Sequence, residues 1–468
     1  MITAMLERDS LDALRAALDR LEEGFRDLPA SADPAPGASG IARVLDEVAG
    51  RLHDNYPYFH PLYAGQMLKP PHPVARTAYA LAQWINPNNH ALDGGRASSA
   101  MEKEAVAQIA GMFGWSEPAP LAHLCGGGTM ANLEALWVAG RLHPGKAIAA
   151  SSQAHYTHGR VAAVLGLPFE AVPCDRRGRL DPDALAARAA RGGLGTVVAT
   201  LGTTATGSVD PLPPILEVAR RHGLRVHADA AYGGYFGLAS NLAPEARQAF
   251  DRLREADSIV IDPHKHGLQP YGCGCVLFRD ASVGRFYKHD SPYTYFTSGD
   301  LHLGEITLEC SRAGASAVAV WATQRLLPLV RGGELAAGLE SGRAAALDLH
   351  GRVCADRRFV PAFEPELDIV VWAVRAPRVS ECSERARAVF AEAARRGLHL
   401  ALAELPADFF ALDAAGVERD AERVTCLRSV LMKPEHRAWI DRIWTILSDA
   451  TDAVCARTPA PPGLTSTS

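Results

Sequence analysis

Short apolar runs that alternate with helical segments shape the chain from about residue 75 onward. The runs AVPCD, TVVATLG, RVHADA, SIVID and CGCVLF are rich in strand-forming residues and predict strands. Helices are expected between several of them, for example over 181–190 and 212–222. Such an alternation forms a mostly parallel sheet, and ligands bind at the carboxyl ends of its strands. The sequence therefore predicts an α/β fold with a site at that edge of the sheet.

An N-terminal arm and linker are expected over residues 1–74. Apolar residues from Leu11 to Phe25 follow a helical spacing behind Ser10, which would cap the helix. Residues 31–40 are small and contain proline and glycine, which is typical of a linker. Because the apolar stripe of the helix needs a partner, we interpret the segment as an arm that docks within the chain or on a second subunit.

The rest of the chain divides into three parts. A large domain is expected over 75–331, a second, smaller α/β domain over 332–457 and a disordered tail over 458–468. The smaller domain is rich in Ala and Arg at its start, and its expected strand and two helices cover 367–374, 382–397 and 434–454.

The composition limits the class of protein. With 468 residues, 48% hydrophobic and 22% charged, the chain has the profile of a soluble globular protein. A net charge of −5 without a marked Lys/Arg cluster argues against nucleic acid as a partner. No apolar run approaches the roughly 18 residues of a membrane span, and the N-terminus lacks a secretory signal. We expect a cytoplasmic protein that does not contact a membrane.

Nine cysteines are scattered along the chain. Cys273 and Cys275 are close together, but their spacing lacks the second pair that a zinc site requires. We expect no metal site and mostly buried, reduced thiols.

The stretch from Ser258 to Phe278 reads as strand, turn and strand, and it places Lys265 at a strand end. A lysine becomes a catalytic nucleophile when its amine forms an imine with a carbonyl group, as it does with pyridoxal phosphate. The alternative is a solvated turn lysine. The catalytic interpretation requires a phosphate cradle, an acid for the pyridine nitrogen and a flat group for the ring.

Each of these three parts has a candidate. Gly126 to Gly128 and Thr129 precede a strong helix, so their amides could hold a phosphate, although an ordinary flexible loop has the same composition. Asp229 ends a predicted strand and could keep a pyridine nitrogen protonated, or cap the next helix instead. His155 offers a flat imidazole, although a lone loop histidine can also be structural.

Five motifs together carry a resemblance to a known family. GGGTMANLEAL, SSQAHYTHGR, GTTATGSVDP, HADAAYGG and DPHKHG resemble, in order and spacing, the group II pyridoxal-phosphate-dependent amino acid decarboxylases. The likeness runs from about residue 60 to 331 and resumes at LRSVLMKPEH. LECSRAGASAVAVW and DPHKHGLQPY are most similar to bacterial tyrosine decarboxylases and related archaeal enzymes. The resemblance implies fold type I, the aspartate aminotransferase-like fold, with a seven-stranded sheet in the large domain.

The resemblance also implies a role for each matched residue. Lys265 would form the imine with the cofactor, Asp229 would pair with its pyridine nitrogen, and His155 would stack on the ring. Ala231 would back the ring and Thr204 would lie near the phenolic oxygen. The phosphate would be held by Gly128, Thr129, His264 and Asp262. Ser311 would reach the phosphate of a neighbouring subunit, which makes the active site composite and a homodimer obligatory.

The reaction implied is loss of carbon dioxide from an L-amino acid, with an aromatic one such as tyrosine favoured. Tyr293 or Tyr295 would protonate the product carbon from a loop; without it, aldehyde formation by oxidative deamination is the alternative. A carbon-carbon lyase on the same fold, or a non-enzymatic protein that retains the fold, also stays open.

Two arginines bear on the substrate. Arg96 replaces a proline of the family's substrate pocket and would favour an acidic substrate, or it pairs with Asp93 or Glu102. Arg428 would face the substrate carboxylate, or it forms a core ion pair.

Overall fold

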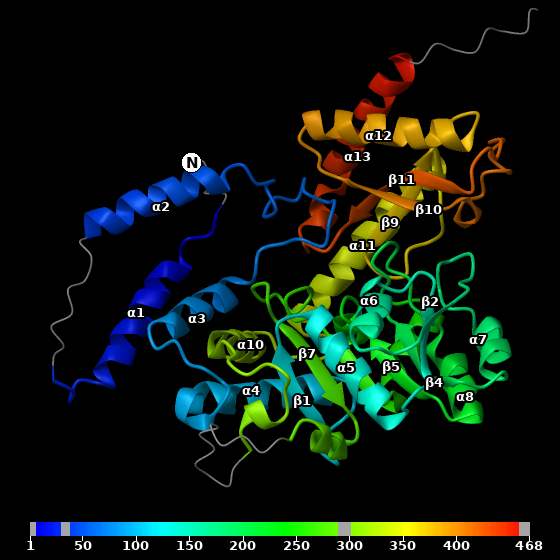
Figure 1. Cartoon of the computed structure of the whole chain (residues 1–468). Coiled ribbons are helices and arrows are strands. Elements are labelled where there is room, and N and C mark those ends of the chain that lie inside the picture. The colour runs from blue at the N-terminus through cyan, green and yellow to red at the C-terminus, as the bar shows by residue number, and fades with distance from the viewer. Residues whose placement is uncertain (1–5, 30–37, 289–300, 458–468) are drawn as a thin grey trace, which may run out of the picture.

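The computed structural model describes residues 6–29, 38–288 and 301–457 of the chain (Figure 1). Its large sheet consists, within these residues, of β1 Leu121–Cys125, β2 Ala147–Ser151, β3 Phe169–Val172, β4 Leu194–Thr200, β5 Arg225–Asp229, β6 Ser258–Ile261 and β7 Gly274–Phe278, in the order β1-β7-β6-β5-β4-β2-β3. The strands β3, β2, β4, β5 and β6 are parallel, and β7 runs antiparallel to both neighbours. The mostly parallel seven-stranded sheet is therefore confirmed.

Helices cover both faces of this sheet, which explains why its strands are almost entirely apolar. Val197 and Ala199 of β4 join the core cluster of one face, whereas Val198 between them joins the cluster of the other. The first face packs against α4 Leu92–Met112, α7 Pro182–Ala189, α8 Leu212–His222 and α9 Pro244–Asp251. The second face packs against α5 Gly128–Leu142 and α6 Thr157–Val164.

The predicted strands and helices of this region are confirmed with small shifts at their ends. The strand expected at AVPCD is β3, which ends at Val172, directly before Pro173. Proline lacks the amide hydrogen that would continue the ladder. The helix expected over 212–222 is α8, and its C-cap Gly223 adopts a φ of 65°, the left-handed conformation that glycine accepts most readily.

The C-terminal part holds a second sheet. Its strands within the described residues are β8 Phe359–Pro361, β9 Ile369–Val374, β10 Ala401–Pro406 and β11 Arg423–Val430, all antiparallel, in the order β10-β11-β9-β8. One face packs against α11 Glu334–Ala355, α12 Val379–Arg395 and α13 His436–Arg457. Figure 1 shows this sheet and α12 and α13 beside the large sheet, with α11 running between them.

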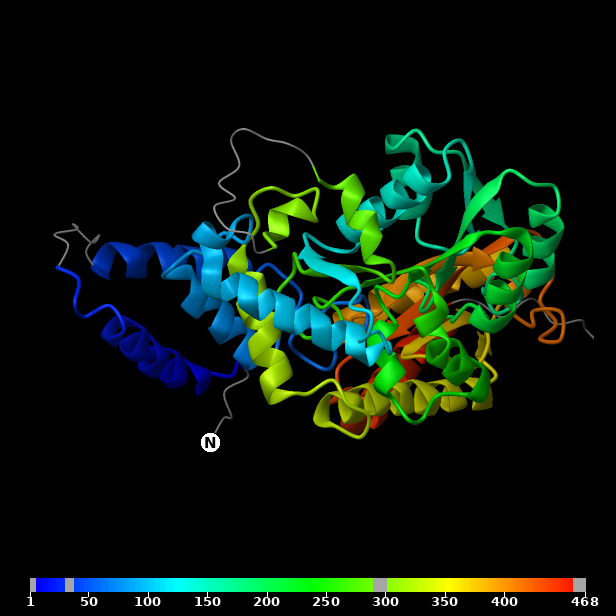
Figure 2. The same cartoon turned by 90° about the horizontal axis from the view of Figure 1, so that it is seen from below.

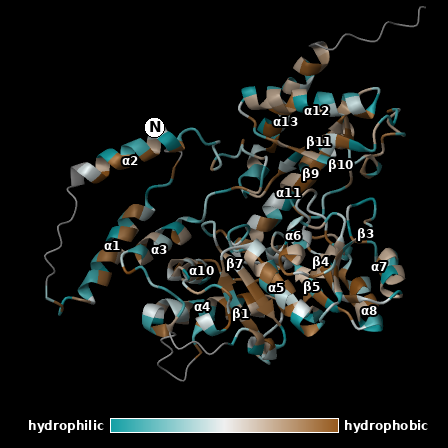
Figure 3. Cartoon of the chain, in the orientation of Figure 1, coloured by the Kyte–Doolittle hydropathy of each residue, from teal (hydrophilic) through white to brown (hydrophobic). Residues whose placement is uncertain are grey.

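Of the N-terminal helices, α1 Ser10–Glu23 and α2 Ala38–Leu52 stand away from this body and α3 Pro73–Gln83 packs against it. Helix α10 Gly314–Leu326 packs against both α3 and α4. Figure 2 shows α1 and α2 projecting from the side of the molecule. Apolar side chains on α2, among them Val44, Leu45 and Val48, are exposed, whereas the central strands are hydrophobic and enclosed (Figure 3).

Two details of the predicted arm are wrong. Ser10 does not cap α1, because the N-cap residue is Asp9 and the Ser10 amide and hydroxyl bond to the Glu7 carboxylate instead. The linker does not reach residue 40, because α2 begins at Ala38. Residues 31–37 and the tail 458–468 lie outside the described residues. No helix in the described part of the chain is long and apolar enough to cross a membrane.

Candidate active site

A cavity of about 400 Å³ opens at the carboxyl ends of the parallel strands of the large sheet, and its lining residues lie between Gly126 and Gly272. This is where open α/β sheets bind ligands. Most of the predicted site residues line it. They are Gly128, Thr129, His155, Thr204, Asp229, Ala231, Asp262, His264 and Lys265.

Lys265 lies in the turn that follows β6, and its amine reaches into this cavity. Its Nζ is 3.1 Å from Oδ2 of Asp262, and its amide donates to the Asp262 carbonyl at 2.9 Å. Asp262 is only 2% exposed, so it supplies a buried counter-charge to the lysine ammonium. Its role as a phosphate contact stays a prediction.

The glycine loop after β1 leaves room for an anion at the start of α5. Gly127 has a φ of 128°, and a Cβ on Gly128 would lie 2.6 Å from Oδ2 of Asp262, so both positions require glycine. Thr129 is exposed in the first turn of α5. The free amides of a helix start carry partial positive charge, which suits a phosphate.

Asp229 ends β5 and is 5% exposed. Its Oδ2 is 2.8 Å from Nε2 of His158, and its Oδ1 accepts a hydrogen bond from the Ala231 amide at 3.1 Å. Burial alone would raise the pKa of Asp229, but the hydrogen bond and charge of His158, with the charge of Lys265, hold it below its ordinary value. Asp229 is therefore an anion that can hold a proton on a ring nitrogen.

Sequence reasoning missed His158, although it lies in the same motif as His155. It is fully buried in α6 and faces Asp229 across the sheet edge. Behind it, His227 bonds Oδ1 of Asn132 at 2.8 Å. The available signal was a second histidine in SSQAHYTHGR, one helical turn beyond the first.

Two further histidines have defined hydrogen-bonding states. Nδ1 of His155 accepts from the Thr157 amide at 3.2 Å, so its proton resides on Nε2. Nδ1 of His264 donates to the Cys273 carbonyl at 2.7 Å. Burial lowers the pKa of both, which keeps His155 a neutral, flat group.

Arg428 lies directly behind the cavity wall. It is 4% exposed, and its guanidinium donates to the carbonyls of Thr204 and Ala205 at 2.7 and 2.9 Å. It also donates to Oε1 of Gln66 at 3.0 Å, another residue that sequence reasoning missed. Within the described residues Arg428 pairs with no carboxylate, so the alternative of a core ion pair is wrong.

Two further predicted residues do not line this cavity. Arg96 is exposed on α4 and does not line the cavity, and Glu102 binds Arg312 at 2.7 Å rather than Arg96. Ser311 is exposed and its hydroxyl accepts from Nδ2 of Asn88 at 3.1 Å. Tyr293 and Tyr295 lie outside the described residues.

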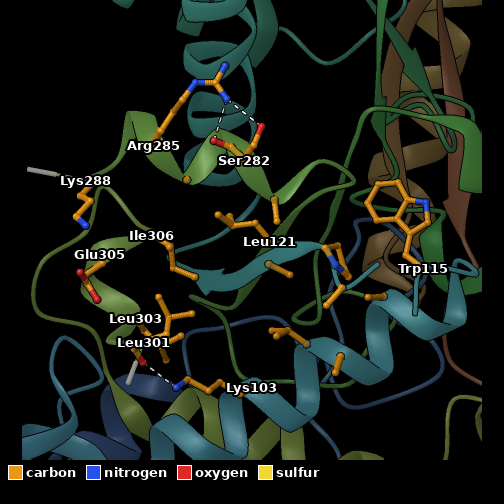
Figure 4. Close-up of a pocket in the computed structure, with 18 of the residues that line it drawn as sticks. Lys103, Trp115, Leu121, Ser282, Arg285, Lys288, Leu301, Leu303, Glu305 and Ile306 are labelled. Carbon is orange, nitrogen blue, oxygen red and sulfur yellow. Dashed lines mark hydrogen bonds between the residues drawn. The ribbon is translucent and has the colours of Figure 1, made fainter. Parts of the chain in front are cut away.

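A larger cavity, of about 790 Å³, lies at the opposite end of β1 (Figure 4). Leu121, Leu303 and Ile306 give it apolar walls, with Lys103 at the rim bonded to the Leu301 carbonyl. In the described part of the chain, the lysines of this cavity form no ion pair with a carboxylate of the kind that Lys265 forms with Asp262, and we assign the cavity no part in the chemistry.

The residues of the Lys265 cavity fit pyridoxal phosphate. The glycine cradle suits the phosphate, and the Asp229 carboxylate suits the ring nitrogen. The His155 imidazole can cover one face of the ring, and the Lys265 amine can react with the aldehyde carbon. Oδ1 of Asp262 and Oγ1 of Thr200 are buried without a hydrogen-bond partner in the described part of the chain, as expected of a polar site built for a ligand. When bound, the cofactor supplies a ring that accepts the electrons left behind as carbon dioxide departs.

Comparisons with known proteins agree with this geometry. The model of the pyridoxal-dependent decarboxylase conserved domain matches residues 137–375. The chain is 30% identical over 334 residues to the probable L-tyrosine/L-aspartate decarboxylase of Methanothermobacter thermautotrophicus, covering 69% of this chain and 85% of that protein. It is 29% identical over 458 residues to the L-tyrosine decarboxylase of Enterococcus faecium, covering 74% of this chain and 73% of that protein.

The fold agrees as well. The structure of Oryza sativa TDC with PLP and tryptamine superposes with a TM-score of 0.75 at 19% identity, over 96% of this chain and 99% of that one. The predicted resemblance, fold type I and cofactor are thus confirmed. This chain belongs to the pyridoxal-dependent decarboxylase family and is a pyridoxal-phosphate-dependent carboxy-lyase that acts on an amino acid.

Proposed function

We propose that the substrate is an L-amino acid with an aromatic side chain, with tyrosine favoured, and that the products are its amine and carbon dioxide. The observation that carries the proposal is an aromatic wall beside the cavity. Tyr271 lines the cavity with 57% of its surface exposed, and its hydroxyl donates to the Met67 carbonyl at 2.8 Å. Nearby, Tyr58 and Tyr63 meet edge-on with ring centroids 4.9 Å apart. A substrate ring can join such an edge-to-face arrangement.

Each residue of the cavity has a distinct task in this proposal. Lys265 holds the cofactor, and Asp262 balances its charge. Asp229 would keep the ring nitrogen of the bound cofactor protonated, which would strengthen the ring as an electron acceptor. His155 covers the ring and Ala231 backs it. The phosphate contacts are Gly128, Thr129 and His264, and Thr204 lies near the phenolic oxygen.

The reaction ends when a proton reaches the α-carbon. Tyr293 and Tyr295 remain the proposed donors, because the resemblance to the family puts a loop tyrosine in this part of the sequence and a phenol can give up a proton to carbon. Phe substitution of the donor should suppress amine formation and increase aldehyde; unchanged amine formation in both variants would remove the two tyrosines from the mechanism.

An acidic substrate is the second candidate, and Arg428 favours it. This buried cation has only neutral acceptors in the described residues, and one of them is the carbonyl of Thr204, which lines the cavity. A substrate carboxylate could complete its bonding. The relative named for both L-tyrosine and L-aspartate supports either side chain. Arg96, which suggested this candidate, is exposed and does not line the cavity.

We also propose a homodimer with a composite active site. The uncovered apolar faces of α1 and α2 need a partner, and the exposed Ser311 is free to reach a neighbouring subunit. Light scattering of the purified protein should give twice the mass of one chain. A monomer with full activity would contradict this part of the proposal.

A substrate panel tests the function. The protein, loaded with pyridoxal phosphate, is incubated with tyrosine, tryptophan, dopa, glutamate or aspartate, and carbon dioxide, amine, aldehyde and hydrogen peroxide are measured. If the amine forms fastest from tyrosine, the result supports the proposal. If carbon dioxide is released fastest from aspartate or glutamate, the result supports the second candidate. No carbon dioxide from any of them would overturn both.

Lys265→Ala is the first variant to make. It should lose the visible absorbance of the lysine-bound cofactor and lower turnover by at least ~10³-fold, because the nucleophile is gone. Lys103→Ala, which removes a rim lysine of the other cavity, is the matched control and should keep both. Absorbance and turnover retained in Lys265→Ala would contradict the assignment.

A further inference from the structure

A buried carboxylate of the small sheet reaches the two segments that carry the active site. Asp368 directly precedes β9 and has no exposed surface. Its Oδ1 accepts a hydrogen bond from the Tyr232 hydroxyl at 2.6 Å, and its Oδ2 lies 3.3 Å from Nε2 of His266. Tyr232 lines the Lys265 cavity, and His266 is the residue after Lys265. Asp368 therefore joins the segment after Asp229 to the Lys265 turn.

The packing around this junction leaves little freedom. The His266 ring meets the rings of Tyr232 and Phe236 edge-on, with centroids 4.8 and 5.0 Å away. The Asp368 carbonyl accepts from the Leu431 amide at 2.8 Å, which fixes the backbone that carries the carboxylate. The two active-site segments also bond directly, from the Asp262 amide to the Ala231 carbonyl at 3.2 Å. A change at Asp368 is thus transmitted to both segments.

A third cavity, of about 470 Å³, lies on the far side of this junction and is named the Asp368 cavity below. Asp368 and His266 line it together with Lys69, whose Nζ donates to the Met432 carbonyl at 3.1 Å. Both ring nitrogens of His266 and Oδ2 of Asp368 are buried and lack a hydrogen bond in the described part of the chain. A cavity of this size with charged side chains in its lining has room for water, which can bring protons to these atoms.

We propose that Asp368, as a carboxylate, is a positioning residue of the decarboxylase: it holds Tyr232 and His266, and through them the Asp229 segment and the Lys265 turn, in their active arrangement. The inference rests on the decarboxylase chemistry and is independent of the substrate's side chain. It also gives His266 a role, because its ring lies between two aromatic rings and this carboxylate.

The charges around Asp368 set the pH range in which it acts. Burial raises the pKa of Asp368 to about 6, against the lowering effect of the Tyr232 hydrogen bond and the charges of Lys69 and Arg428. Burial also keeps the pKa of His266 well below its ordinary value, so the ring stays neutral. The other titratable side chains of the Asp368 cavity are His72, Glu334 and Glu435.

The sign of the pH effect follows. Above about pH 6 Asp368 is ionised, accepts the hydrogen bond from Tyr232 and lies as an anion against the His266 ring. Below that pH it carries a proton and loses this charge, so the segments loosen and activity falls. The wild-type kcat should therefore decline on the acidic side with a midpoint near 6, and the visible absorbance of the bound cofactor should change over the same range.

Asp368→Asn tests the proposal in the loaded enzyme. The amide keeps the shape but not the charge, and we expect kcat to fall about 10-fold with KM changed less than about 3-fold, as for other residues that orient a catalytic group. The acidic decline of kcat and of the cofactor absorbance should disappear. Tyr232→Phe, which keeps the ring, should give part of the same loss, and the double variant should lose little more.

Glu366→Gln is the matched control. Glu366 is an equally buried carboxylate two residues away, but it binds Arg177 and the Val209 amide and touches neither active-site segment. It should lower the melting temperature without altering the pH profile. An Asp368→Asn enzyme with the wild-type profile in both readouts would overturn the proposal, and so would an identical change in Glu366→Gln. Because the absorbance is read without substrate, failure of every substrate in the panel would leave this test intact.

Discussion

Asp229 and Asp368 are both buried carboxylates near the cofactor cavity, yet their pKa values are shifted in opposite directions. The pKa of Asp229 lies below its ordinary value because His158 and Lys265 supply positive charge within reach, whereas burial dominates at Asp368 and raises its pKa to about 6. Among the described residues, the side chain of Asp368 directly contacts a phenol and a neutral imidazole and no cation. Burial alone therefore does not decide a carboxyl group's state; the charge of the nearest partner does.

Among changes to the two carboxylates and their partners, the largest effect should come from removing the charge of Asp229. Asp229→Asn keeps the bond to the Ala231 amide through its carbonyl oxygen but cannot hold a proton on the ring nitrogen. We expect kcat/KM to fall at least ~10²-fold, the scale of a lost electrostatic contact at a reacting centre. Steady-state kinetics with the best substrate of the panel measures it. A fall no greater than that of Asp368→Asn would erase the distinction between the two carboxylates.

His158→Asn should make Asp229 resemble Asp368. The amide can still donate a hydrogen bond but brings no positive charge, so burial would raise the pKa of Asp229. We expect a 10- to 100-fold loss of kcat, of the order seen when an orienting partner is removed. Asp229 should then add a second titrating group to the acidic decline, so the decline becomes steeper or moves to higher pH. His143→Asn, which changes a histidine bonded to the Gly195 carbonyl at the other end of the sheet, is the control; an unmoved profile in His158→Asn would break the comparison.

The smallest effect should come from Lys69→Met, which removes the ammonium group from the Asp368 cavity while retaining an aliphatic side chain. The charge of Lys69 lowers the pKa of Asp368, so its loss should raise that pKa further. The midpoint of the acidic decline should rise by about half a unit to one unit, equivalent to about 1 kcal/mol, with kcat at pH 8 nearly unchanged. A midpoint that moves down, or stays fixed while Asp368→Asn abolishes the decline, would contradict this account of the charges.

The site residues that short motifs carry were the ones sequence reasoning could find. Lys265, Asp229 and His155 each follow an expected strand, and parallel strands bring their carboxyl ends to one edge. Asp368 had no such signal, because its partner Tyr232 lies 136 residues earlier in the chain, in the turn after a strand of the other sheet. His158 was within a quoted motif, but nothing in the sequence paired it with Asp229.

The two arginines show the same limit. A proline replaced by Arg96 pointed to a substrate contact, yet α4 exposes that side chain, while Arg428 on β11 sits behind Thr204 with its charge unpaired by any carboxylate among the described residues. Charge is readable from sequence, but the direction in which a side chain points depends on the register and packing of its element.

The sequence by itself determined the alternation of strands and helices, the glycine loop, the lysine turn and the family, because these depend on local periodicity and on residues close together in the chain. Only the tertiary structure decided the electrostatics: that His158 makes Asp229 an anion, that Asp368 clamps Tyr232 to His266, and which arginine lies behind the cavity. Such interactions join residues far apart in sequence, and their strength depends on distance and burial, which exist only after the sheets and helices have packed.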